Sequence, residues 1–140
     1  MPYASVSDMI DRFGERELIA NTTPEGMPKN GIDQAKVTLA LTNASSLIDS
    51  YLNRRFATPL ATPPNSIADA CCRIARYALA QTGASQPTEQ MRLDRKDAVE
   101  WLTHISRGTV TLDGQTPANE SKSWSRISRR QAMQSGGRLW

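Results

Sequence analysis

The chain has 140 residues, of which 39% are hydrophobic, and a formal net charge of +3. This size predicts one compact domain with a tail. The sequence has no secretory h-region and no apolar run of about 18 residues, so we expect neither export nor a membrane span. Cys71 and Cys72 are adjacent, which makes a disulfide between them sterically poor, and we expect both to stay reduced in a cytosolic setting.

The excess positive charge is confined to the end of the chain. Residues 1–112 contain equal numbers of basic and acidic residues. The tail, 113–140, therefore carries the whole net charge, because its five basic residues exceed its two acidic ones by three. The basic residues of the tail are Lys122, Arg126, Arg129, Arg130 and Arg138.

Helical periodicity begins near the N-terminus. Ser5 and Asp8 resemble a capping box, apolar residues follow at helical spacing, and Gly14 is expected to end this helix as a left-handed cap. Residues 15–20 predict one more short helix. Residues 21–32 contain two prolines and two glycines and predict a loop.

The longest amphipathic segment is Asp33–Phe56, for which Asp33 is a suitable N-cap. A helix of this length is long enough to span a small domain. Ser45 is expected on its polar side, and Leu39 is an isolated apolar residue on that side. The residues of the apolar arc are Val37, Ala40, Leu41, Ala44, Leu47, Ile48, Tyr51 and Leu52.

A second strongly apolar helix follows a proline-rich crossing at 57–64, which the prolines should keep extended. Asn65 or Ser66 is expected to cap this helix. Because its polar side is narrow, we expect the helix to be nearly surrounded, either at the centre of a bundle or against a neighbouring subunit. The polar strip consists of Asp69, Arg73 and Arg76.

The last predicted helix begins at Thr88 and closes at Arg107–Gly108. Arg95 lies on its apolar side, where an aliphatic or aromatic residue is expected. Residues 109–112 alternate like a short strand, and no periodicity follows. The sequence therefore predicts an all-α bundle of about four main helices, with a short extended segment and a basic tail that is flexible in the free protein.

No catalytic constellation is visible. His104 is the single histidine, and the vicinal cysteines have no second pair with which to form a zinc site. Nucleotide-binding and nucleophile-elbow motifs are absent. His104 is expected to be a solvated surface residue, Cys71 a small core residue and Cys72 a residue at the flank of the core. We therefore expect no enzyme activity, no cofactor and no metal.

Two features suggest an interaction protein. Leu39, Leu79 and Leu93 lie off the inward stripes of their helices, which makes them candidate subunit contacts. The tail contains tryptophan and arginine, the residues that most often anchor interfaces. Its candidate docking residues are Trp124, Arg126, Arg129, Arg130, Leu139 and Trp140, with Arg138 a candidate for facing a lumen and DNA.

The order and spacing of several short motifs resemble one known family. They are Tyr3–Gly14, Ala44-Ser45 with Ile48–Leu52, Arg55-Phe56, Pro59-Leu60, Pro63-Pro64, Ile74–Tyr77, Asp97-Ala98, Trp101-Leu102 and Gly108. Taken together, residues Tyr3–Leu112 resemble the head–tail connector (head-completion, gp36-type) proteins of Mu-like phages and prophages. Phe56 replaces a usual tyrosine, and Arg95 stands where an aromatic residue is common.

This resemblance implies a helical adaptor that binds beneath the portal protein as a ring, expected to be a dodecamer, with DNA passing through its lumen. The adaptor would link the portal to a tail-side completion or terminator protein. It would be located at the head–tail junction of the virion, and in the host cytoplasm during assembly.

The alternative from another class is a small DNA-binding protein that uses the basic tail. Against it, residues 1–112 have no net positive charge, whereas a DNA reader usually presents a basic face on a folded helix.

Overall fold

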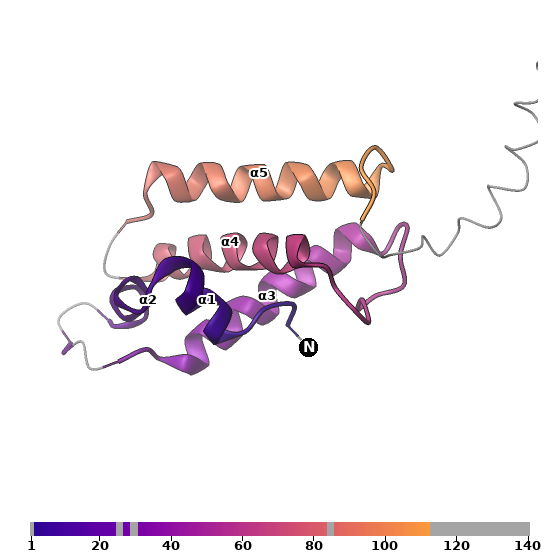
Figure 1. The fold of residues 1–140 in the computed structure, drawn as a ribbon. Coiled ribbons are helices and arrows are strands. Elements are labelled where there is room, and N and C mark those ends of the chain that lie inside the picture. The colour runs from indigo at the N-terminus through magenta and orange to yellow at the C-terminus, as the bar shows by residue number, and fades with distance from the viewer. Residues whose placement is uncertain (1, 25–26, 29–30, 84–85, 113–140) are drawn as a thin grey trace, which may run out of the picture.

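The computed structural model describes residues 2–24, 27–28, 31–83 and 86–112. All regular secondary structure in these ranges is helical, which confirms the predicted all-α class. Figure 1 shows α4 between α5 and α3, with α1 and α2 packed at one end of the bundle. The helices are α1 (Val6–Phe13), α2 (Glu15–Thr22), α3 (Gln34–Leu52), α4 (Asn65–Thr82) and α5 (Glu89–Ser106).

Three helices begin where the sequence predicts, and each has a side-chain cap. The Ser5 and Asp8 side chains form a reciprocal capping box at α1. Asp33 accepts a hydrogen bond from the Lys36 amide at α3, and Thr88 caps α5. Gly14 separates α1 from α2 with φ near +90°, which favours glycine, although its ψ is extended and not left-handed helical.

The start of α4 differs from the prediction. Its N-cap is Pro64, not Asn65 or Ser66, and no side chain caps it. The Pro64 carbonyl accepts from the amides of Ile67 and Ala68, so the backbone alone closes the first turn. The fixed φ of proline allows this early start, because Pro64 is extended while the following residue is already helical.

The α4 helix packs against each of the other four helices, as its narrow polar strip predicts. Cys71 faces α3, with its Sγ 3.4 Å from the Ser45 hydroxyl oxygen. Cys72 and Leu79 are also buried. The prediction that Cys72 flanks the core is therefore wrong. Cys72 and Leu79 are seven residues apart and therefore lie on the same side of α4. Because α1 and α2 also pack on α4, this side belongs to the core.

The N-terminal segment covers part of α3 and buries Ser45, which was expected on the polar side. The Tyr3 amide donates to Ser45 Oγ at 2.9 Å. The Tyr3 hydroxyl donates to Asp49 and accepts from the Leu60 amide at 3.0 Å. Burial and the hydrogen bond to Asp49 together raise the pKa of Tyr3 to about 12. Tyr3 thus joins the N-terminus, α3 and the proline-rich crossing.

The predicted strand at 109–112 does not form. The described part of the chain contains no β-strand with which this segment could pair. The alternation has another cause: Leu112 is buried and Val110 is partly buried against the core, while Thr109 and Thr111 are exposed. The segment seals the bundle through its side chains and not through a backbone ladder.

Candidate assembly surfaces

The tail residues predicted to dock on a partner all lie outside the described residues. They are Trp124, Arg126, Arg129, Arg130, Leu139 and Trp140, and Arg138 lies outside as well.

Two of the three predicted leucines are exposed. Leu39 on α3 is 61% exposed and Leu93 on α5 is 38% exposed. Leu79 is 3% exposed and packs in the core, so its expected position off the core is wrong. Met27, between α2 and α3, is a third exposed large apolar side chain and was not singled out from the sequence.

The exposed face of α3 around Leu39 carries no charged side chain between Lys36 and Asp49. Its exposed neighbours are small or uncharged and polar: Thr38, Thr42, Asn43, Ser46 and Ser50. Such a face costs little to desolvate, because no charge has to leave water. Together with an exposed leucine, it has the composition expected of a contact surface.

Arg76 joins four helices. Its guanidinium lies 4.4 Å from the ring centroid of Phe13 on α1 and donates two hydrogen bonds of 2.8 Å to Glu17 on α2. Its Nη1 lies 3.6 Å from Asp94 on α5. Hydrogen bonding to Glu17 raises the pKa of Arg76. Because Glu17 and Asp94 pair with its positive charge, Arg76 holds the helices together and is not available to bind a partner.

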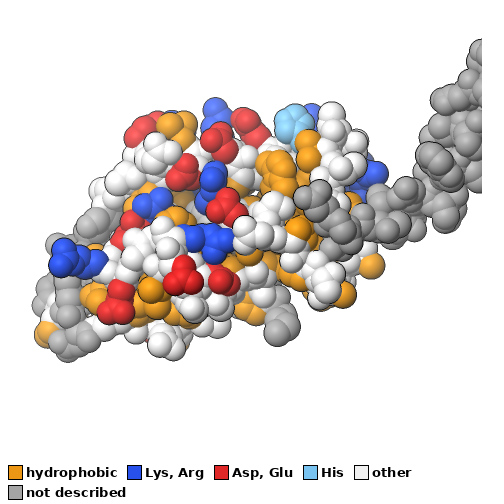
Figure 2. Space-filling model, viewed as in Figure 1, with side chains coloured by type: hydrophobic (Ala, Val, Ile, Leu, Met, Phe, Trp, Pro, Cys, Tyr) orange, Lys and Arg blue, Asp and Glu red, His pale blue; other side chains and the backbone are white. Residues whose placement is uncertain are grey.

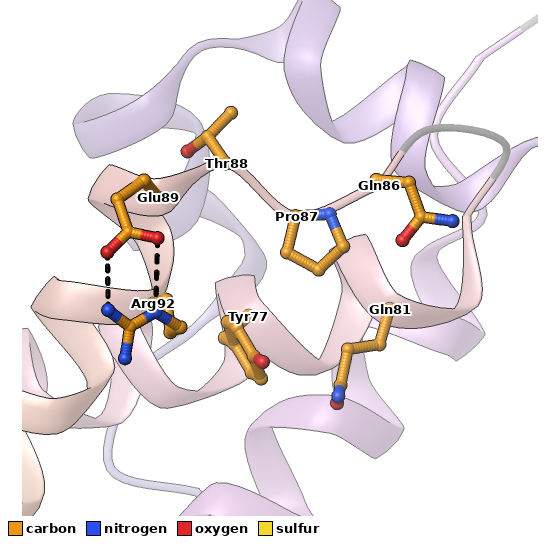
Figure 3. A pocket seen from close by; sticks show the side chains of 7 residues that line it. All are labelled: Tyr77, Gln81, Gln86, Pro87, Thr88, Glu89 and Arg92. Carbon is orange, nitrogen blue, oxygen red and sulfur yellow. Dashed lines mark hydrogen bonds and ion pairs between the residues drawn. The ribbon is translucent and has the colours of Figure 1, made fainter.

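A shallow hollow lies where the end of α4 meets the start of α5 (Figure 3). Tyr77 and Gln81 line it from α4, and Arg92 on α5 is held by an ion pair with Glu89. Just beyond the hollow, the Arg95 guanidinium lies 5.7 Å from the ring centroid of Tyr77. This cation–π contact explains how α5 accommodates an arginine at the edge of its apolar stripe.

A second group of arginines gathers where the C-terminal ends of α3 and α5 meet. Arg54, Arg55 and Arg107, hereafter the arginine pole, form no ion pair within the described residues. Arg55 lies against the backbone of Gly108, since a Cβ added to that glycine would come 2.9 Å from Arg55 Nη1. Figure 2 shows basic side chains and the histidine, with no acidic ones, over the end of the body near the grey chain.

The arginine pole was not predicted from the sequence. The sequence places arginines at the ends of two predicted helices, but it does not show that the two ends come together. His104 is exposed nearby on α5, as predicted. Among the described residues, no group of three or more His, Cys, Asp or Glu side chains could hold a metal ion. None of the described helices is both long and apolar enough to cross a membrane.

Comparison with known proteins decides the family. The pattern of the family described as Bacteriophage Mu, Gp36 matches residues 3–128. The chain belongs to this family. It is 36% identical over 144 aligned positions to the Mu-like prophage FluMu protein gp36 of Haemophilus influenzae, covering 99% of this chain and 92% of that protein. It is 37% identical over 111 positions to gene product J of Escherichia phage Mu, covering 77% of this chain and 74% of that protein.

Membership confirms the resemblance drawn from the short motifs and places the chain among phage and prophage proteins. The match also runs past Leu112 to residue 128, further than the motifs reach. It therefore includes Trp124 and Arg126, two of the predicted docking residues of the tail.

Proposed function

We propose that this protein is a non-catalytic structural component of the phage particle, a head–tail connector. It assembles as a ring of twelve subunits beneath the portal protein. The ring joins the portal to a tail-side completion or terminator protein, and DNA passes through its lumen. The protein would be found at the head–tail junction of the virion, and in the host cytoplasm before assembly.

The observation that carries this proposal is the family match over residues 3–128. The body supports it, because Leu39 and Leu93 project from different helices, with α4 between α3 and α5 (Figure 1). A ring needs such an arrangement, in which one patch of a subunit meets a different patch of the next subunit. We therefore propose that the α3 face around Leu39 and the α5 face around Leu93 contribute to the contact between subunits.

The tail is proposed to dock on the portal or on a neighbouring subunit. Its arginines would meet acidic groups, and Trp124 and Trp140 would fill apolar slots. A segment that orders only on its partner loses conformational entropy at that moment, so its affinity depends on a few strong anchors. Aromatic anchors are not screened by salt, whereas ion pairs are.

Assembly onto purified portal rings, followed by sedimentation at low and high salt, tests this proposal. We expect Trp124→Ala and Trp140→Ala to weaken assembly about as much as serine at Arg126, Arg129 and Arg130, and to do so at both salt concentrations. If the arginine changes alone weaken assembly and the tryptophan changes do not, the docking role fails.

The proposed contact surfaces on α3 and α5 are tested by a separate experiment, which measures ring formation. Leu39→Asp and Leu93→Asp place a charge in the proposed contact without touching the core, and we expect either to abolish rings. Met27→Asp is the matched control, because Met27 is 59% exposed but lies outside the helices. Normal rings from the Leu39 and Leu93 variants would remove these faces from the interface.

A further inference from the structure

We propose that the arginine pole holds the phosphates of duplex DNA without reading its sequence. Arg54 and Arg107 are exposed and Arg55 is half-buried, and none of the three is matched by a carboxylate in the described part of the chain. The inference assigns a ligand to one end of the folded body, and it stands whether or not the chain forms a ring.

The simplest competing role for these arginines is to cap the negative ends of the α3 and α5 dipoles. Backbone groups, however, already close both ends. The Phe56 amide donates to the Leu52 carbonyl at 2.8 Å, and the Thr109 amide donates to the His104 carbonyl at 2.9 Å. The arginine side chains that donate hydrogen bonds within the described residues are those of Arg12, Arg76 and Arg92, so the guanidinium groups of the pole are not used as caps.

Arg55 is preorganised for such a ligand. Its guanidinium lies 6.0 Å from the ring centroid of Phe56 and rests against Gly108, so its orientation is set before binding. Its Nη1 is buried without a hydrogen-bond partner. A phosphate could not reach this buried atom, but it could pair with the rest of the half-buried guanidinium and stabilise its positive charge.

The surroundings of the pole favour phosphate over a protein surface. A stable protein interface needs an apolar centre. The exposed large apolar side chains of the described residues are Met27, Leu39 and Leu93, and none belongs to the pole. Leu39 lies 15 residues before Arg54 along α3 and its end, which is about 22 Å of helix. Phosphate binding needs only well-placed cations, and arginine is the residue whose planar fork fits phosphate best.

The neutral net charge of residues 1–112 gives no indication of this local group of arginines. Residues 1–112 are neutral overall, but their acidic side chains lie away from the end where α3 and α5 meet on the face shown in Figure 2. The basic tail also begins at residue 113, six residues after Arg107 in sequence. The pole therefore lies at the end of the body from which the tail continues, although the first basic residue of the tail is Lys122.

The test measures binding of the full chain to a labelled 20-base-pair duplex of random sequence, by fluorescence anisotropy over a series of KCl concentrations. The pole variant is Arg54→Ser with Arg107→Ser. Its matched control is Arg16→Ser with Lys96→Ser, which removes the same charge from exposed positions on α2 and α5. All four side chains are exposed, and circular dichroism confirms that both variants stay folded.

We expect the pole variant to bind about tenfold more weakly at low salt. The slope of log affinity against log salt should become shallower by about 1–2, since each phosphate contact contributes about −0.9. The control should change affinity by no more than about twofold. Serine at Arg126, Arg129 and Arg130 measures the contribution of the tail, and the loss at the pole should persist in that background.

Three outcomes would overturn the assignment. Equal losses from the pole variant and the control would mean that only total charge matters. Undiminished DNA binding by the pole variant would exclude the pole as a phosphate site, and so would a loss confined to assembly on the portal. Failure of the ring assay with normal pole-dependent DNA binding would instead contradict the connector role and leave this inference standing.

Discussion

At the scale of single residues, Ile48 and Ile74 lie in the core of α3 and α4, 0% and 6% exposed. Alanine at either position should lower the free energy of unfolding by about 2–5 kcal/mol, through lost burial and the cavity left behind. Leu39→Ala is the matched control and should stay within about 0.5 kcal/mol, because Leu39 is exposed. Urea denaturation measures all three. An unchanged midpoint for Ile74→Ala would contradict the position of α4.

Tyr3 gives the protein a specific sensitivity to alkali. Its pKa is raised from an ordinary value near 10 to about 12 in the folded state, so between these values the unfolded chain loses the proton first. Stability should therefore fall as the pH rises from about 10 to about 12. Tyr3→Phe should cost about 1–3 kcal/mol at neutral pH, since Asp49 and the Leu60 amide lose their partner.

The Tyr3→Phe variant should also flatten the stability curve between pH 10 and 12. Some decline should remain, because burial raises the pKa of Cys72 from 9 to about 12 in the same direction. Equal slopes for the wild-type protein and the variant, measured by denaturation across this range, would show that the Tyr3 hydroxyl is not buried in this way.

Helical spacing predicts which residues of a helix face its main packing partner. It does not predict which residues are buried by a second element that packs on another side of the helix. The prediction places Ile48 and Ile74 correctly because α3 and α4 pack on each other through their main apolar arcs. It fails at Leu79 because α1 and α2 cover another side of α4, and at Ser45 because the N-terminal segment covers α3. These contacts join residues distant in sequence, so no local pattern encodes them.

At the scale of elements, the helix ends were predictable where a side chain makes the cap and not where the backbone does. Ser5 and Asp33 cap their helices as expected, and Thr88 caps α5 at its predicted start, whereas α4 begins at Pro64 with no side-chain cap. The alternation at 109–112 corresponds to the burial of Val110 and Leu112 between exposed threonines, although no strand forms. It could not distinguish a strand from a loop that packs on helices, because both bury alternate residues.

Periodicity also predicts where the stable elements stop. Because it ends at Leu112, limited proteolysis of the free protein should trim the tail rapidly and halt near Leu112. The α3 helix should resist cleavage, because its core residues are packed against α4 and α5. Mass spectrometry of the fragments gives the cut sites. Early cleavage within α3, or protection of the whole chain, would contradict this division into body and tail.

At the scale of the whole molecule, the arrangement of charge and apolar surface matters more than composition. DNA contact by the body was not expected from the sequence, because residues 1–112 have no net charge. The fold instead gathers Arg54, Arg55 and Arg107 at one end, and leaves Leu39 and Leu93 exposed on outer helices. The arginine grouping could not be predicted without knowing which helix ends come together, whereas the exposure of Leu39 and Leu93 was expected from helical spacing.

The connector role is tested most directly by electron microscopy of the full-length protein mixed with purified portal rings of its own phage. We expect class averages that show an added ring coaxial with the portal at one end, with an open central channel and the rotational symmetry of the portal. Portal rings that remain unchanged at protein concentrations well above those of the portal, or protein bound only at scattered positions, would contradict the role.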